Sequence, residues 1–187
     1  MRVMTRLNPT QLTLATVAHE AGVVPATLIQ RFGTKRELLL AACRTWSSGI
    51  AELFAATRER YTSPLKMLFE VLVGCSSVAA TPEALANGLA YLQNDITDPD
   101  FHAITLQGFV DMRSEILKLL DEALDAGEIR KCNTRQLARL IESVYNGSML
   151  TWAIHRQGSL ASWMRADLNA LLAPHTSQGK KRKPRKS

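Results

Sequence analysis

Residues 13–39 read TLATVAHEAGVVPATLIQRFGTKRELL, a run with two short helical patterns followed by the start of a third. The apolar positions of the first pattern have the spacing that lines one face of a helix, and they are Leu14, Val17, Ala18 and Ala21. Gly22 follows them and supplies the permissive backbone that a tight turn needs. We therefore expect the first helix to end at Gly22.

A second helix is expected from Pro25 to Arg31, since proline is favoured at the first helical position, where its missing N–H costs nothing. This helix would bury Leu28 and the following Phe32 and leave its other side chains facing elsewhere. Thr34-Lys35-Arg36-Glu37 then fits a capping box that opens a third helix. The pattern predicts a helix-turn-helix, the arrangement that places a helix in the major groove of DNA.

At these positions the sequence resembles the TetR family of bacterial transcriptional regulators. The matching residues are Thr13, Val17, Ala18, Ala21, Gly22, Val23, Thr27, Leu28, Phe32, Thr34, Lys35, Glu37, Leu38 and Leu39. The resemblance implies an all-α protein in which a helix-turn-helix DNA-binding domain is followed by a helical bundle that binds a ligand and dimerises. It implies a ligand-responsive regulator, usually a repressor, that acts as a homodimer on a palindromic double-stranded DNA operator.

The resemblance also implies which residues contact DNA: Thr13, Val24, Pro25, Ala26, Thr27, Ile29, Gln30, Arg31, Thr34 and Lys35. Thr27 and Gln30 would read base edges, while Lys35 and the amides near Thr34 would hold phosphates. Val24 and Ile29 depart from the family, which usually has serine and tyrosine there, and neither side chain can donate a hydrogen bond.

The N-terminus departs further, because only twelve residues precede Thr13 and they lack an apolar stripe. Asn8-Pro9-Thr10-Gln11 reads instead as a capping box that starts the next helix early. We expect the first family helix to be absent or vestigial. Two explanations stay open: a start codon upstream of Met1, or a shortened regulator with weakened DNA affinity. The alternative function is a truncated helical dimer that keeps ligand binding but has lost or weakened DNA binding.

The net charge of +6 is unevenly distributed along the 187 residues. Residues 1–60 hold eight Lys/Arg against four Asp/Glu, residues 61–178 hold nine against thirteen, and residues 179–187 hold six against none. A basic helix-turn-helix end beside an acidic middle is expected if only one lobe approaches phosphates. We expect a DNA-binding domain at 1–50, a ligand-binding and dimerisation domain at 51–175, and a disordered basic tail at 176–187.

Beyond Thr34 the chain reads as helix throughout. Ser63-Pro64, Thr81-Pro82 and Asp98-Pro99 each pair a capping residue with a proline, which predicts three helix starts. Asn133 and Ser159 predict two more. The expected helices lie near 35–60, 64–80, 82–93, 99–126, 134–157 and 160–173, which with the two motif helices gives about eight.

Broadly apolar helices in the middle of the chain suggest a ligand cavity where they fail to close. The resemblance places its lining at Leu72, Cys75, Leu89, Leu92, Phe109, Met112, Arg113, Tyr145, Met149 and Trp152. Ordinary core packing is the alternative for each of them. Arg113 could pair with an acidic ligand or with an acid of the chain such as Asp111 or Glu115. The lining indicates a small hydrophobic effector of unknown identity.

The last two helices supply the expected partner surface, because apolar residues recur there at three- and four-residue steps. The candidate dimer residues are Leu137, Ile141, Val144, Ser148, Trp152, Trp163, Leu168 and Leu171. The alternative is that these stripes pack only within one chain.

The sequence contains no recognisable catalytic or metal-binding pattern. The four histidines lie far apart, and Cys43, Cys75 and Cys132 have no C-x-x-C partner, so we predict no enzyme, no cofactor and no metal. No apolar run is long enough for a membrane span, and no export signal is apparent. We expect a cytoplasmic protein that does not enter a membrane.

Overall fold

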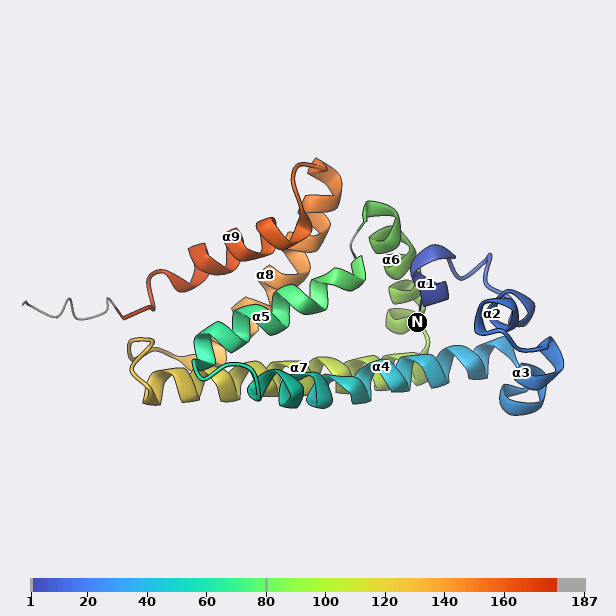
Figure 1. The fold of residues 1–187 in the computed structure, drawn as a ribbon, viewed down its shortest axis with the longest axis horizontal. Helices are drawn as coiled ribbons and strands as arrows, with labels where there is room; N and C mark the ends of the chain where they lie inside the picture. Colours follow the sequence, from blue (N-terminus) through green and yellow to red (C-terminus); the bar gives the residue numbers. More distant parts are fainter. Residues whose placement is uncertain (1, 80, 178–187) are drawn as a thin grey trace, which may run out of the picture.

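The computed structural model describes residues 2–79 and 81–177, and that part of the chain is helical (Figure 1). Its elements are α1 (Arg2–Arg6), α2 (Leu14–Ala21), α3 (Pro25–Phe32), α4 (Lys35–Arg58), α5 (Pro64–Ser76), the 3-10 helix η1 (Ser77–Ala79), α6 (Pro82–Thr97), α7 (Pro99–Asp125), α8 (Thr134–His155) and α9 (Leu160–Leu172). An isolated bridge between Ile129 and Thr176 is the only β pairing among these residues. The predicted all-α class is confirmed.

Helix starts follow the caps that the sequence predicts. The hydroxyl of Ser63 accepts the Lys66 N–H at 3.1 Å, and that of Thr81 accepts the Ala84 N–H at 3.1 Å. The carboxylate of Asp98 accepts the Asp100 N–H at 3.0 Å. Each cap satisfies an amide that the helix itself leaves unpaired, and a proline follows it in the first turn.

The long helices α4 and α7 lie side by side, and the others are arranged around this pair (Figure 1). Helices α5, α8 and α9 pack together and close one side of it, while α2 and α3 sit at the N-terminal end of α4. The expected domain boundary at residue 50 falls inside α4, which runs without a break from the helix-turn-helix into the bundle. Helix α4 is therefore part of both the helix-turn-helix and the bundle.

The main core lies where five helices meet. Buried side chains come from α4, α5, α7, α8 and α9, and examples at 0 to 1% exposure are Phe54, Leu72, Leu120, Ile141 and Leu168. A second cluster joins Leu12, Leu39 and Leu40 to Tyr91 of α6 and Phe101 of α7. Because this cluster contains both the entry to α2 and the start of α4, it fixes the helix-turn-helix against the bundle.

The N-terminus corrects two predictions. The helix that precedes the motif is vestigial, one of the two expected outcomes: α1 is only five residues long, and with it the described chain has nine α-helices rather than about eight. It packs on α6, with Val3 and Met4 against the second cluster. Asn8 does not start a helix: its side chain accepts the Thr10 and Gln11 N–H groups at 3.0 and 3.1 Å within a turn, and α2 begins only after its own cap. A cap alone cannot propagate a helix that lacks an apolar face to bury.

Two boundaries also shift toward the C-terminus. The helix expected at 82–93 continues to Thr97, where the α7 cap Asp98 ends it. Thr176 and Ser177 were assigned to the disordered tail, yet they extend beside Glu128–Arg130, with the Ser177 N–H donating to the Glu128 carbonyl at 2.9 Å. Residues 178–187 of the expected tail lie outside the described residues. Within the described chain, no helix combines the length and apolar character that crossing a bilayer requires.

The central position of Leu120 predicts a large loss of stability on truncation. Leu120→Ala should lower the free energy of unfolding by about 3 kcal/mol, since it removes buried methyl groups and leaves a cavity. Leu106→Ala is the matched control on the same helix, because Leu106 is 53% exposed and should change stability by less than about 0.5 kcal/mol. Chemical denaturation measures both, and equal effects would contradict this account of the core.

Candidate functional site

The α2–α3 unit is built by local caps. The hydroxyl of Thr13 accepts the Thr16 N–H at 3.0 Å, and the hydroxyl of Thr16 accepts the Thr13 N–H at 2.9 Å. The helix ends at Gly22, whose φ of +67° lies in the left-handed region that favours glycine. The chain then turns through Val23 and Val24 into α3. The predicted helix-turn-helix is confirmed, and α3 ends at Phe32, one residue beyond the expected end.

Helix α3 packs against the protein on one side and is exposed to solvent on the other. Within it only Leu28 is buried, at 8% exposure, and Phe32 is half-buried. The remaining side chains of the helix are exposed, as are Val24 at 64% and Ile29 at 53%. The residues expected to contact DNA that lie on this exposed surface are Val24, Pro25, Ala26, Thr27, Ile29, Gln30 and Arg31. The segment can therefore enter a groove without rearranging its own chain.

The start of α4 carries the other expected DNA contacts. Thr34 is exposed and caps α4, its hydroxyl accepting the Glu37 N–H at 3.1 Å. The Lys35 ammonium is half-buried and donates to the backbone carbonyl of Pro9. Lys35 thus ties the N-terminal segment to α4, and it has further N–H donors for a phosphate. Thr13, the remaining expected contact, is exposed at the start of α2.

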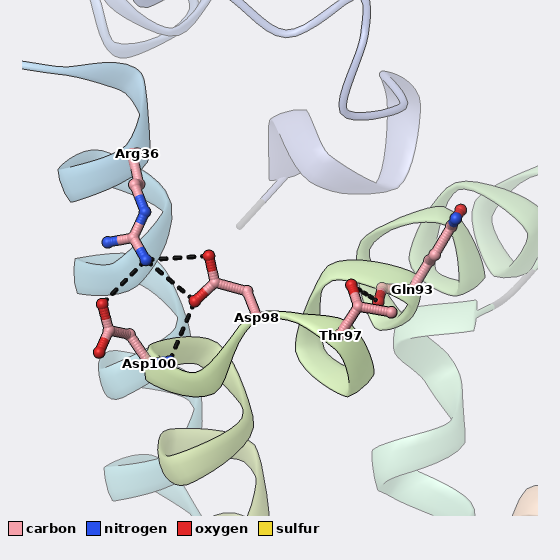
Figure 2. Close-up of polar contacts among 5 residues, drawn as sticks. All are labelled: Arg36, Gln93, Thr97, Asp98 and Asp100. Atoms are coloured by element: carbon pink, nitrogen blue, oxygen red, sulfur yellow. Dashed lines mark hydrogen bonds and ion pairs between the residues drawn. The ribbon is translucent and has the colours of Figure 1, made fainter.

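An arginine in the first turn of α4 joins the helix-turn-helix to the bundle (Figure 2). The Arg36 guanidinium donates to both carboxylate oxygens of Asp98 at 2.9 Å and to Asp100 at 2.8 Å. It also lies over the Phe101 ring, 5.5 Å from the centroid. Since Asp98 ends α6 and caps α7, this one side chain holds the corner between those helices. Hydrogen bonding from Arg36 lowers the pKa of Asp98 below its ordinary value, which favours its ionised form.

Helix α6 holds the N-terminal segment on one face. The Tyr91 hydroxyl donates to the Leu7 carbonyl at 2.9 Å, and the Asn87 side-chain amide donates to the Thr5 carbonyl at 3.1 Å. Its other face lines a cavity through Leu85, Leu89 and Asp95. A displacement of α6 by a bound molecule would therefore act directly on the segment that leads into α2.

The cavity has a volume of about 320 Å³ and is bounded by α4, α5, η1, α6, α7 and α8. Eight of the ten expected lining residues do line it: Leu72, Cys75, Leu89, Leu92, Phe109, Met112, Tyr145 and Met149. Trp152 does not, because it packs in a separate cluster with Ala79 and Leu85 and donates its indole N–H to the Gly158 carbonyl at 3.2 Å. Arg113 does not line it either, because its guanidinium pairs with Glu142.

The polar part of the lining was not predicted. It comprises Cys43, Ser47, Asp95, Thr105, Glu142 and Asn146, accompanied by Trp46. An acidic residue on an amphipathic helix ordinarily faces solvent, and this general rule argues against placing Asp95 or Glu142 in a cavity. One signal was available: Glu142 follows Ile141 and precedes Val144 and Tyr145, a stretch that the helical pattern assigns to an apolar face.

The expected dimer residues are largely used inside the chain. Five of the eight are buried in the chain itself: Leu137, Ile141, Ser148, Trp152 and Leu168. The Ser148 hydroxyl donates to Asp167 of α9 at 2.6 Å, which ties α8 to α9. Val144, Trp163 and Leu171 are half-buried. The assignment of the five buried residues to a partner surface is therefore corrected, because side chains enclosed by their own chain are not available to a second copy.

The outer face of α8 offers a different apolar surface. Leu140 is 38% exposed, Leu150 50% and Ile154 75%, and Gly147 lies between them on the same side of the helix. We call Leu140, Gly147, Leu150 and Ile154 the α8 outer face.

Comparison with known proteins agrees with this architecture. Residues 1–42 match a family model described as bacterial regulatory proteins, tetR family. A TetR transcription regulator from Haloarcula marismortui has a similar fold, with a TM-score of 0.75 and 15% identity over 94% of this chain and 93% of that one. A TetR-family regulator from Agrobacterium tumefaciens gives 0.70 and 16% identity over 93% and 92%.

A third similar structure is the complex of SmeT with triclosan, with a TM-score of 0.67 and 21% identity over 91% of this chain and 84% of that one. SmeT is described as the repressor of the Stenotrophomonas maltophilia multidrug efflux pump SmeDEF. A search of curated proteins found no match.

Two glycines next to the cavity predict opposite responses to the same substitution. A Cβ at Gly88, inside α6, would meet no atom within 4 Å, so Gly88→Ala should raise the free energy of unfolding by about 0.5–1 kcal/mol through helix propensity. A Cβ at Gly108 would lie 3.0 Å from the Ser47 hydroxyl, so Gly108→Ala must displace α4 or Ser47 and should gain nothing or lose stability. Chemical denaturation of both variants tests this, and a stabilised Gly108→Ala would show that α4 and α7 are less tightly apposed.

Proposed function

We propose that the chain is a ligand-responsive transcriptional regulator of the TetR type, because its residues 1–42 match the tetR family model and its fold is similar to that of a TetR transcription regulator. It binds a palindromic operator as a homodimer, and a small molecule in the cavity changes its affinity for DNA. We propose that it represses transcription. It would do so in the cytoplasm, where such a regulator meets DNA.

The exposed surface of α3 is the observation that carries this proposal. Thr27 and Gln30 offer hydrogen-bonding groups suited to base edges. Val24 and Ile29 stand out from the same surface, and apolar side chains of this kind contact thymine methyl groups. Arg31 adds a positive charge that forms no ion pair within the described chain. The backbone amides at the start of α4, near Thr34, suit a phosphate oxygen.

The dimer is proposed to form through the α8 outer face. Its apolar side chains are exposed in one copy, and Gly147 at its centre allows the backbone of a second helix to approach closely. A two-fold arrangement would bury the same residues from both copies. The two α3 helices would then face the same side of the dimer, as successive half-sites of an operator require.

Ligand and DNA binding are coupled, on this proposal, through α6 and the corner at Arg36. A molecule in the cavity contacts α6 on the face opposite Tyr91 and Asn87, which hold the N-terminal segment. A displaced α6–α7 corner also moves Arg36, and with it the first turn of α4. The ligand then changes DNA affinity only to the extent that it prefers one orientation of the DNA-reading unit.

Thr27→Ala and Gln30→Ala should each weaken operator binding by about 1–3 kcal/mol, because each removes a base contact. Fluorescence anisotropy with promoter fragments recovered by chromosomal footprinting of the native protein measures the effect. Thr62→Ala and Gln136→Ala are matched controls, since these exposed residues lie far from α3 in sequence and belong to the bundle. If the native protein binds no fragment in a sequence-dependent, salt-sensitive way, the regulator proposal fails, and a helical dimer that binds a ligand but not DNA replaces it.

Ile154→Asp should dissociate the dimer, since it places a charge within a proposed apolar contact. We expect dimer affinity to fall at least about tenfold, as for a buried anchor residue. Ile96→Asp is the matched control, because Ile96 is 66% exposed on α6, away from this face. Light scattering coupled to size-exclusion chromatography reports the mass of each variant, and an Ile154→Asp protein that stays dimeric would exclude the α8 outer face.

A further inference from the structure

The charged groups in the cavity wall indicate what kind of molecule it takes. We propose that the effector is an organic cation, a protonated amine carried on an aromatic or aliphatic body. The inference rests on the proposed function, since it assigns the chemical class of the effector in that same cavity. It goes beyond a hydrophobic effector because it depends on the two acids of the lining.

All charged side chains that line the cavity in the described chain are acidic. They are Asp95 from α6 and Glu142 from α8, and no lysine, arginine or histidine joins them. Arg113 offsets one of the two negative charges from outside the lining. A ligand with one positive charge would neutralise the other, whereas an anionic ligand would add a third negative charge to a confined site.

Glu142 presents an unfilled acceptor. The side chain is 9% exposed, and its Oε2 accepts hydrogen bonds from Nε of Arg113 at 2.9 Å and from Nη2 of the same residue. Its Oε1 is buried and has no hydrogen-bond partner among the described residues. A buried carboxylate oxygen without a donor is costly, and a protonated amine supplies the missing N–H together with the opposite charge.

Asp95 is the second acidic position. Burial raises the pKa of its carboxyl above the ordinary value, while a hydrogen bond from Thr105 opposes that rise. Thr105 also contacts the Cys43 thiol at 3.5 Å, so its hydroxyl is shared between two partners. An ammonium group here would favour the ionised carboxylate and would be held more tightly in return.

The remaining residues of the cavity lining suit the uncharged, aromatic or aliphatic part of such a cation. Trp46 and Phe109 are partly exposed aromatic side chains that line the cavity, and Tyr145 adds a third ring. Aromatic faces attract organic cations through the quadrupole of the ring. The volume of about 320 Å³ is at the small end for ligand pockets, which favours a single-ring or short-chain amine.

The test uses three probes with one body and different charges: phenylbutylamine, phenylbutanol and phenylbutyrate. Isothermal titration calorimetry of the full chain without DNA at neutral pH should give the amine at least about tenfold tighter binding than the alcohol, with the carboxylate weakest. Phenylbutanol or phenylbutyrate binding as tightly as the amine would overturn the inference, and so would no binding by any probe.

Substitutions at Glu142 and Asp95 test whether these two carboxylates cause the tighter binding of the amine. Glu142→Gln should remove most of the advantage of the amine over the alcohol, and Asp95→Asn should reduce it as well. Glu70→Gln is the matched control, because Glu70 also pairs with an arginine across two helices, with Arg165 at 3.0 Å, but lies outside the cavity. Circular dichroism melting of each variant verifies that it is folded.

An amine preference that survives both cavity variants would place the cation elsewhere and overturn the assignment. These outcomes are separate from the regulator proposal. Equal binding of amine and alcohol would leave a ligand-binding cavity with a wrong charge assignment, whereas failure of the DNA-binding experiment would leave the calorimetry unaffected.

Discussion

The packing of α4 along α7 is the contact on which the rest of the molecule depends. Gly108 lacks a side chain at the point where Ser47 approaches, and a Cβ there would lie only 3.0 Å from the serine hydroxyl. The two helices can therefore run side by side for most of their length (Figure 1). Since α4 begins at the helix-turn-helix and passes the cavity in its middle, the orientation of α3 depends on how α4 rests against α7.

The polar contacts that link the helix-turn-helix to the bundle are precise in geometry but weak in energy. The Arg36 side chain is 45% exposed and that of Asp100 is 68% exposed, and ion pairs at such exposed positions contribute little to stability. Tyr91 adds one hydrogen bond to the N-terminal segment. Restraints of this size hold one orientation in the absence of other forces, and a bound molecule or a DNA duplex can overcome them. A regulator requires this balance, because its two states must differ by only a few kcal/mol.

Much of the fold could be predicted because its signals are local. Ser63, Thr81 and Asp98 each cap a helix through an amide two or three residues away, so the sequence window contains the whole interaction. The direction of burial is not local. Leu137 and Ile141 face the core while Leu140 and Ile154 face outward, and a helix with apolar residues on both sides does not reveal which side meets its own chain.

The candidate site shows the same division between features that local sequence determines and features that distant residues determine. The exposure of α3 followed from its sequence, because the helical pattern turned only Leu28 and Phe32 of this helix toward the protein. Most of the apolar cavity lining was also found, because the resemblance to the TetR family implied which positions of the middle helices line the cavity. Asp95 and Glu142 were missed because their burial is produced by facing helices that are distant in the sequence.

The unbroken course of α4 has a mechanical consequence. From Ile50 at the cavity wall to Lys35 at its first turn, the helix covers about 22 Å at a rise of about 1.5 Å per residue. A tilt of roughly 5° at the cavity would then shift the far end by about 2 Å over that lever arm. That shift is comparable to the range over which a hydrogen bond to a base edge is lost. In a symmetric dimer the α4 helix of each copy would tilt. The distance between the two α3 helices would then change by twice the shift that one copy undergoes.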